Sequence, residues 1–211
     1  MAEETTNSRL EAFCDAVFAI ALTLLILEIK TPVSDNIHTS GDLWLSLRHL
    51  LPSVFAFLLS FTIIIVVWVN HHSFMKAIHG STPAFIYSNL FLLLTVVVIP
   101  FPTALLAEFC FTKAAAPSVV LYSLSILFTN IGWILITQAA LARDTLAKGE
   151  AAKAMIKEMS RQGQMAFVLY LVCAILAFWF PLLVSIIISL TFFVWLVLGL
   201  RYKQNFQPAK S

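Results

Sequence analysis

Residues 9–30 read RLEAFCDAVFAIALTLLILEIK, an apolar segment with charged residues at both ends. Its uncharged part, residues 16–27, would span only about 18 Å as a helix, whereas the hydrocarbon of a bilayer is ~30 Å thick. Asp15 precedes this part and Glu28 follows it. A helix of this kind is stable in a membrane where its charged ends meet water or protein instead of lipid. The segment therefore predicts a membrane helix whose ends lie against water or protein instead of lipid.

The rest of the chain predicts further membrane helices. Of the 211 residues, 60% are apolar and 11% are charged, whereas a soluble protein carries roughly 25% charged residues. Pro181 lies near the middle of the last uncharged run, beside aromatic residues, which indicates a turn between two short crossings. We therefore predict an all-α membrane protein that crosses the bilayer about six times as a single domain, residues 1–211. The uncharged runs are residues 50–69, 84–107, 114–142 and 162–200.

The basic residues predict how the helices are oriented. Cytoplasmic loops of membrane proteins are enriched in Lys and Arg. With the N-terminus inside, ten of the 13 Lys and Arg residues lie on the cytoplasmic side and three on the outer side. Both termini are therefore predicted to be cytoplasmic, and residues 143–161 are predicted to extend a helix into the cytoplasm. The inner residues are Arg9, Lys76, Arg143, Lys148, Lys153, Lys157, Arg161, Arg201, Lys203 and Lys210; the outer ones are Lys30, Arg48 and Lys113.

Several functional classes lack their sequence motifs. The chain has no GxxxxGK[S/T], GxSxG, HExxH or CxxC motif, so common ATPases, hydrolases and metalloproteases are not indicated. It also has no TVGYG filter and no regularly spaced arginines within a span. We predict no enzymatic activity, no cofactor and no nucleic-acid partner. The three cysteines, Cys14, Cys110 and Cys173, lie in or beside apolar runs, and no disulfide is predicted.

The first helix carries one continuous apolar stripe. At ~100° per residue, Ile20, Leu24 and Leu27 fall within about 60° of one another, and Thr23 borders them. Asp15 lies about 140° from Ile20, so it faces a different neighbour. A stripe of this kind usually packs on another helix, and the spacing alone leaves open whether it packs or lines a space.

Asp15 requires a polar partner, because an ionised carboxylate beside hydrocarbon is costly. Arg9 is one candidate, although it does not share a helical face with Asp15. The segment WVNHH, residues 68–72, supplies others at the cytoplasmic end of the second predicted helix. Its adjacent histidines point about 100° apart, which disfavours a shared metal ion. We predict a hydrogen-bond network between helices and no metal site.

These two segments resemble a known family. Arg9, Phe13, Cys14 and Asp15 resemble the RxxxFSD signature of the transmembrane protein 175 family, which comprises lysosomal and bacterial potassium-permeable channels. The segment at residues 68–72 resembles the family's second-helix pattern. Cys14 replaces the serine of the signature, and a thiol is a weaker hydrogen-bond partner than a hydroxyl.

The resemblance implies a homotetramer in a bacterial inner membrane, with the first helix of each subunit lining a central pore for potassium and other monovalent cations. Ile20, Leu24 and Leu27 match apolar rings that narrow and close this pore. Thr23 matches a threonine that contributes to ion selectivity. The signature and the network between helices match Arg9, Phe13, Cys14, Asp15, Trp68, Asn70, His71 and His72.

Two other functions are compatible with the membrane fold. The first is a secondary transporter or proton-coupled carrier, a class that favours broken helices near the midplane. Pro100 and Pro102 fit a break, but they lie near the outer end of the third predicted span, and charges deep in the spans are lacking. The second is a scaffold without transport activity.

Overall fold

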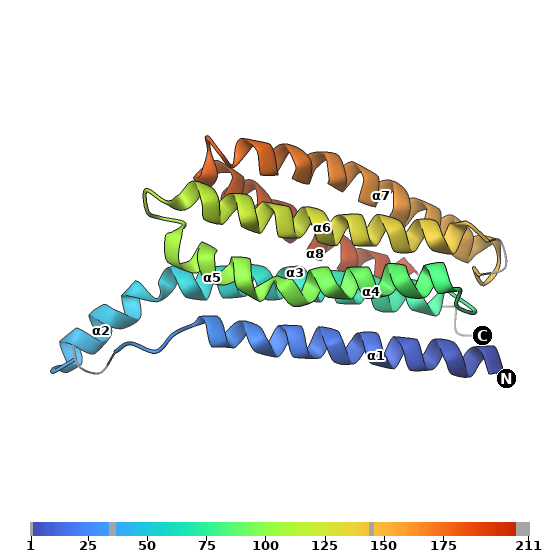
Figure 1. Cartoon of the computed structure of the whole chain (residues 1–211), viewed down its shortest axis with the longest axis horizontal. Coiled ribbons are helices and arrows are strands. Elements are labelled where there is room, and N and C mark those ends of the chain that lie inside the picture. Colours follow the sequence, from blue (N-terminus) through green and yellow to red (C-terminus); the bar gives the residue numbers. More distant parts are fainter. Residues whose placement is uncertain (1, 34–36, 144–145, 206–211) are drawn as a thin grey trace.

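Long helices run side by side along the longest axis of the molecule (Figure 1). A computed structural model describes residues 2–33, 37–143 and 146–205, and within these ranges the side chains of residues 7–195. Within these ranges, five segments are long and apolar enough to cross a membrane, and a further apolar helix covers Pro181–Trp195. The all-α membrane fold is thereby confirmed. The helices are α1 (Ala2–Leu24) with the 3-10 turn η1 (Leu25–Glu28), α2 (Ser40–His49), α3 (Leu51–Lys76), α4 (Pro83–Val98), α5 (Pro100–Phe109), α6 (Ala115–Leu141), α7 (Gly149–Leu176) and α8 (Pro181–Asn205).

The third span consists of two helices, α4 and α5, because Pro100 interrupts its hydrogen bonds. Proline has no backbone N–H and therefore cannot donate to the carbonyl of Val96. The N–H of Ile99 donates to that carbonyl instead, at 3.1 Å, which tightens the last turn of α4. The helix resumes at once, since the N–H of Thr103 donates to Ile99 O at 3.1 Å. The interruption is a local adjustment within one span.

The predicted turn before Pro181 is confirmed. Helix α7 ends at Leu176 and α8 begins at Pro181. The N–H of Phe180 still donates to Leu176 O at 2.8 Å, and Pro181 then starts the next helix.

At the opposite end of α7, Gly149 has a φ of 86°, a conformation that glycine adopts without strain. Residues 143–161 were predicted to extend a helix into the cytoplasm, and the helix in this stretch begins at Gly149.

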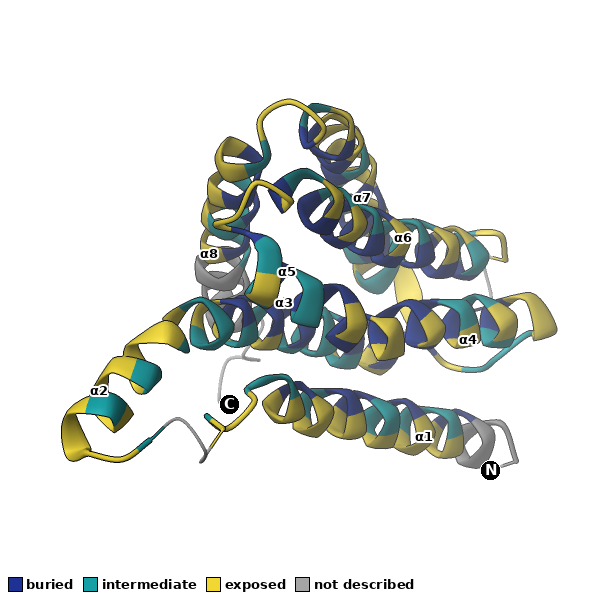
Figure 2. Ribbon diagram, turned by 60° about the vertical axis from the view of Figure 1, so that its left-hand side comes forward, coloured by how far each residue is buried: buried dark blue, intermediate teal, exposed yellow. Residues whose placement is uncertain are grey.

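Helix α2 projects from the bundle (Figure 2), and the sequence reasoning did not anticipate it. It begins with a capping box in which the N–H of Asp42 donates to Thr39 Oγ1 and the N–H of Thr39 donates to Asp42 Oδ2. Hydrogen bonds from the Thr39 side chain and from the backbone N–H groups of His38 and Thr39 lower the pKa of Asp42. None of its residues is buried.

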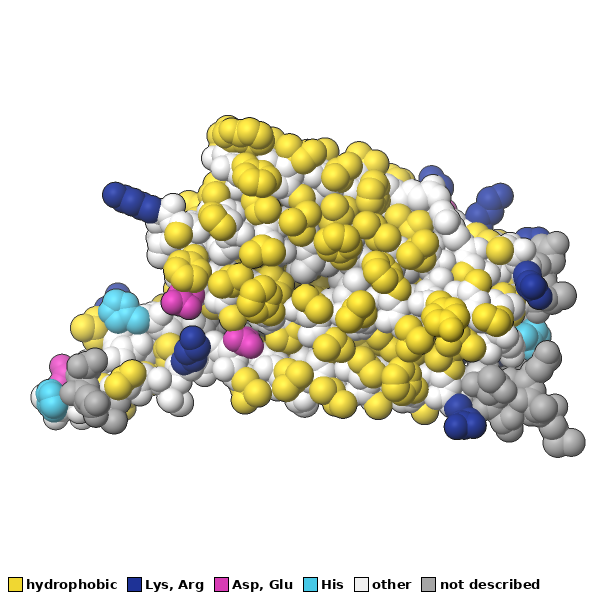
Figure 3. Space-filling view, in the orientation of Figure 1, with side chains coloured by type: hydrophobic (Ala, Val, Ile, Leu, Met, Phe, Trp, Pro, Cys, Tyr) yellow, Lys and Arg dark blue, Asp and Glu magenta, His cyan; other side chains and the backbone are white. Residues whose placement is uncertain are grey.

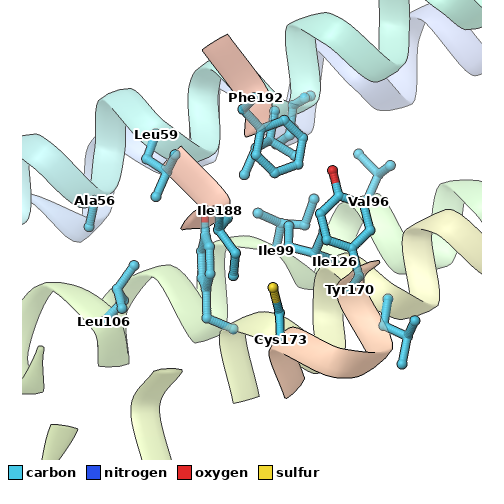
Figure 4. Packing of buried hydrophobic residues seen from close by; sticks show 14 of the residues in the cluster. Ala56, Leu59, Val96, Ile99, Leu106, Ile126, Tyr170, Cys173, Ile188 and Phe192 are labelled. Atoms are coloured by element: carbon cyan, nitrogen blue, oxygen red, sulfur yellow. The ribbon is translucent and has the colours of Figure 1, made fainter. Parts of the chain in front are cut away.

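The main core cluster takes buried side chains from α1 and from α3 to α8, and they are mainly aliphatic and aromatic (Figure 4). Tyr170 of α7 stacks on Phe192 of α8 with ring centroids 6.0 Å apart. A polar group is embedded here: Ser60 Oγ lies 2.7 Å from Thr103 Oγ1 and 3.0 Å from Tyr122 Oη. This group is internally satisfied and links α3, α5 and α6. All three cysteines are free and buried.

Candidate functional site

Helix α1 lies at the edge of the bundle and packs against α3 and α4 on one face only (Figures 1 and 2). Cys14, Phe18, Ala21 and Leu25 recur at intervals of three and four residues and are completely or almost completely buried. This periodicity is that of one helical face. The bundle therefore fixes the rotation of α1 about its own axis.

The predicted apolar stripe lies on the opposite face of α1. Ile20 is 58% exposed, Leu24 38% and Leu27 69%, and Thr23 is also exposed. Figure 2 shows this face as a band of exposed residues that points away from the other helices. Of the two possibilities that the sequence left open, packing within the subunit is thus excluded. The stripe must be covered by lipid, by water or by another protein surface.

Thr23 presents its oxygen on the same exposed face. Its hydroxyl donates to the carbonyl oxygen of Ile20 at 2.8 Å. A hydroxyl has one proton and two lone pairs. Because the backbone takes the proton, the lone pairs remain available to a cation or to a water molecule.

Two polar pairs hold α1 against α3 near the N-terminal end of α1. Trp68 Nε1 donates to Asp15 Oδ1 at 2.8 Å. His72 Nδ1 lies 3.2 Å from Glu11 Oε1, within ion-pair range, although the angle is too poor for a hydrogen bond. The rings of Trp68 and His72 stack with centroids 5.8 Å apart. Trp68, and not Arg9, is therefore the hydrogen-bond partner of Asp15.

A second, buried group joins α1, α3 and α4. His71 Nε2 lies 2.8 Å from Asn89 Oδ1, and the ring of His71 contacts that of Phe18 at 5.4 Å. Cys14 Sγ reaches the same Asn89 oxygen at 3.9 Å. A thiol at this distance is a weak donor, so Cys14 contributes mainly by packing. The adjacent histidines point to different partners, as their angular separation predicts.

Three of the predicted site residues are not joined to this network. Among the described residues, Arg9 makes no hydrogen bond or ion pair, and its side chain is exposed. Phe13 is 51% exposed beside the apolar stripe. Asn70 is half-buried and lines a cavity between α3, α6, α7 and α8. Polarity made Arg9 and Asn70 candidate partners of Asp15, whereas the family resemblance alone implied a role for Phe13.

The sequence reasoning missed two partners, Glu11 and Asn89. Glu11 precedes Asp15 by four residues and therefore shares its helical face, a signal that was available. Asn89 is a carboxamide within an otherwise apolar run, which also marks it as a candidate for hydrogen bonding between helices. Asn7 adds a further tether, because its Nδ2 donates to Ile78 O at 3.1 Å.

Ligand atoms of Glu11, Asp15 and His72 lie within 4.8 Å of one another, so these residues could hold a divalent cation. Each of them already has a protein partner: Glu11 and His72 pair with each other, and Asp15 accepts from Trp68. The protein contacts account for this cluster, and we assign no metal to it.

Asp15→Ala and Trp68→Phe are each expected to lower the free energy of unfolding by about 1–3 kcal/mol, because each leaves a partly buried group without its partner. The double variant should cost less than the sum of the two. Thermal or denaturant unfolding of the detergent-solubilised protein measures both. Trp44→Phe, on the exposed helix α2, is the matched control and should change stability by less than ~0.5 kcal/mol. Strictly additive losses would show that the Asp15–Trp68 contact carries no coupling energy.

Comparisons with known proteins agree on one protein family. The sequence profile described as "Endosomal/lysosomal potassium channel TMEM175" matches residues 9–100. A potassium channel of Chamaesiphon minutus is 38% identical over 193 residues, which cover 90% of this chain and 95% of that channel. A potassium channel of Streptomyces collinus is 39% identical over 133 residues, 60% of this chain and 63% of the relative. The crystal structure of a lysosomal potassium-selective channel TMEM175 homolog from Chamaesiphon minutus superposes with a TM-score of 0.83 at 33% identity, covering 92% of this chain and 98% of that one.

Proposed function

Since this chain belongs to the TMEM175 family and is a potassium channel of that family, we propose that α1 helices from several subunits line a central ion path. It is a multi-pass integral membrane protein, and its bacterial relatives indicate the bacterial inner membrane. The observation that carries the proposal is the division of α1 into two faces. One face is buried and anchored by polar pairs, and the other presents Ile20, Thr23, Leu24 and Leu27 outward.

A pore requires more than one copy of the chain. A single α1 has one exposed face and cannot enclose a path by itself. The family resemblance implies a homotetramer with six crossings per subunit and both termini in the cytoplasm. Rotational symmetry of this kind places the same face of every α1 toward the axis. The short uncharged part of α1 is consistent with a position beside the pore axis, because the charged ends of the helix would then meet water and protein.

The constriction in this proposal is a ring of branched apolar side chains from Ile20, Leu24 and Leu27. Such a ring excludes water when it is narrow, and a cation in an apolar neck loses its hydration at a large cost in free energy. Widening of the ring lets water enter, and partly hydrated cations pass. Because potassium holds water less tightly than sodium, the ring favours potassium without a TVGYG filter.

Thr23→Ala is expected to lower the permeability ratio of potassium to sodium about two- to tenfold, the equivalent of the ~0.5–1.5 kcal/mol of one hydroxyl contact. The hydroxyl donates to Ile20 O, so its lone pairs are free to contact the ion. Reversal potentials under mixed-ion conditions measure the ratio. Thr62→Ala is the matched control, since the half-buried Thr62 on α3 also donates its hydroxyl to a backbone carbonyl of its own helix, Leu58 O. An unchanged ratio in Thr23→Ala would leave Thr23 without a role in selectivity.

Recordings from the purified protein in planar bilayers test the function as a whole. A channel gives unitary current steps carried by potassium, whereas a carrier turns over too slowly to produce them. Liposomes that hold the protein and stay impermeable to potassium would instead favour a scaffold.

A further inference from the structure

A cavity of about 900 Å³ lies between α3, α6, α7 and α8. Its size is at the upper end of the ~300–1,000 Å³ range of small-molecule sites. Most of its wall is apolar, and it is partly open at one side. Residues of its wall include Val67, Trp133, Met155, Met159, Tyr170 and Phe192.

The cavity extends along much of α3. It is lined on this helix from Ile63 to Lys76, a distance of about 20 Å at 1.5 Å per residue. The acyl chains of one leaflet occupy about half of the ~30 Å hydrocarbon core. The cavity is therefore long enough for one acyl chain that runs parallel to the helices.

Two lysines mark one end of the cavity. Lys76 ends α3 and Lys148 precedes α7, and both line the cavity and are exposed. Backbone pairing brings them together, since the N–H of Lys148 donates to Ala77 O at 2.9 Å. In the part of the chain that the structure describes, neither lysine is paired with a carboxylate. Two unneutralised cations at the mouth of an apolar cavity are complementary to a ligand with an anionic head and an apolar tail.

The C-terminal end of α3 and the start of α7 lie at the end of the bundle where α1 begins (Figure 1), and basic side chains gather at this end (Figure 3). With the N-terminus in the cytoplasm, as the basic residues predict, this end faces the cytoplasmic leaflet. That leaflet carries anionic lipids, and basic pockets between helices on that side bind their head groups. From this combination we infer that the cavity binds an anionic phospholipid, with its phosphate at Lys76 and Lys148 and one acyl chain among α3, α6, α7 and α8. The bound chain would contact Trp68 and His72, whose side chains line the cavity and also hold α1.

Native mass spectrometry of the detergent-solubilised assembly tests this site without reference to ion conduction. We expect phosphatidylglycerol to be retained at one molecule per subunit, and phosphatidylcholine with the same acyl chains to be lost at least about tenfold more readily. The double variant Lys76→Gln/Lys148→Gln should lower retention of phosphatidylglycerol about tenfold. Lys113→Gln, at the opposite end of the bundle, is the control and should not.

A second pair of variants tests the cavity itself. Ala151→Trp places an indole at the cavity wall and should abolish retention, whereas Ala154→Trp, on the same helix but not lining the cavity, should leave it intact. Equal retention of both phospholipids, or retention unaffected by Ala151→Trp, would overturn the inference. Displacement of phosphatidylglycerol by equimolar oleate would overturn the phospholipid assignment in favour of a free fatty acid.

Discussion

Ile20→Asn is expected to raise the potassium leak of reconstituted liposomes by at least about tenfold, equivalent to a barrier lower by ~1.4 kcal/mol. Ile20 is the first residue of the exposed apolar stripe and forms part of the proposed constriction. Asparagine is smaller and offers hydrogen bonds, so a ring of these side chains stays hydrated where a ring of isoleucine excludes water. A cation then crosses the neck without losing as much of its hydration. The preference for potassium over sodium should fall for the same reason.

The control for this prediction is Ile175→Asn on α7. Ile175 is 51% exposed, similar to Ile20, but it lies on a helix outside the proposed ion path. The same substitution there should leave the leak close to that of the unchanged protein. If Ile20→Asn leaves both the leak and the selectivity unchanged while Ile175→Asn raises the leak, the ion path does not run along α1.

Gly132→Val is expected to prevent correct folding, and Gly132→Ala to lower the free energy of unfolding by about 1–3 kcal/mol. Gly132 lies where α6 crosses α4, and a Cβ atom added there would stand 2.9 Å from Leu92 Cα and 3.2 Å from Leu92 Cβ. The nearest atom belongs to the backbone, so the two helices must move apart. Close approach through small residues is a main source of helix association in membranes.

Folded yield on size-exclusion chromatography and thermal unfolding in detergent measure this effect. Gly80→Ala is the matched control, because a Cβ atom at Gly80 would meet nothing within 4 Å and its φ is not positive. That variant should fold as well as the unchanged protein. Equal stability of Gly132→Ala and Gly80→Ala would show that α4 and α6 are not held at this distance.

Length and hydropathy determined the helical character and the approximate limits of the spans, and Pro181 with its aromatic neighbours determined the turn. These features depend on local properties: a run of apolar residues must satisfy its own backbone in lipid, and proline limits the residue before it. The polar residues at the end of α1 and in residues 68–72 were also evident, because a charged or hydrogen-bonding side chain in a span requires a partner.

Only the tertiary structure decided which partners these residues take and which face of α1 is left uncovered. The helical wheel gives the angles between Ile20, Leu24 and Asp15, but not the rotation of the whole helix against its neighbours. In a soluble protein the apolar face would reveal the buried side; in a membrane, lipid and protein interior are equally apolar, so hydropathy does not distinguish them. The rotation is set by Phe18 and Ala21 packing on α3 and α4 and by Glu11, Asp15 and Asn89 meeting residues that are distant in the sequence.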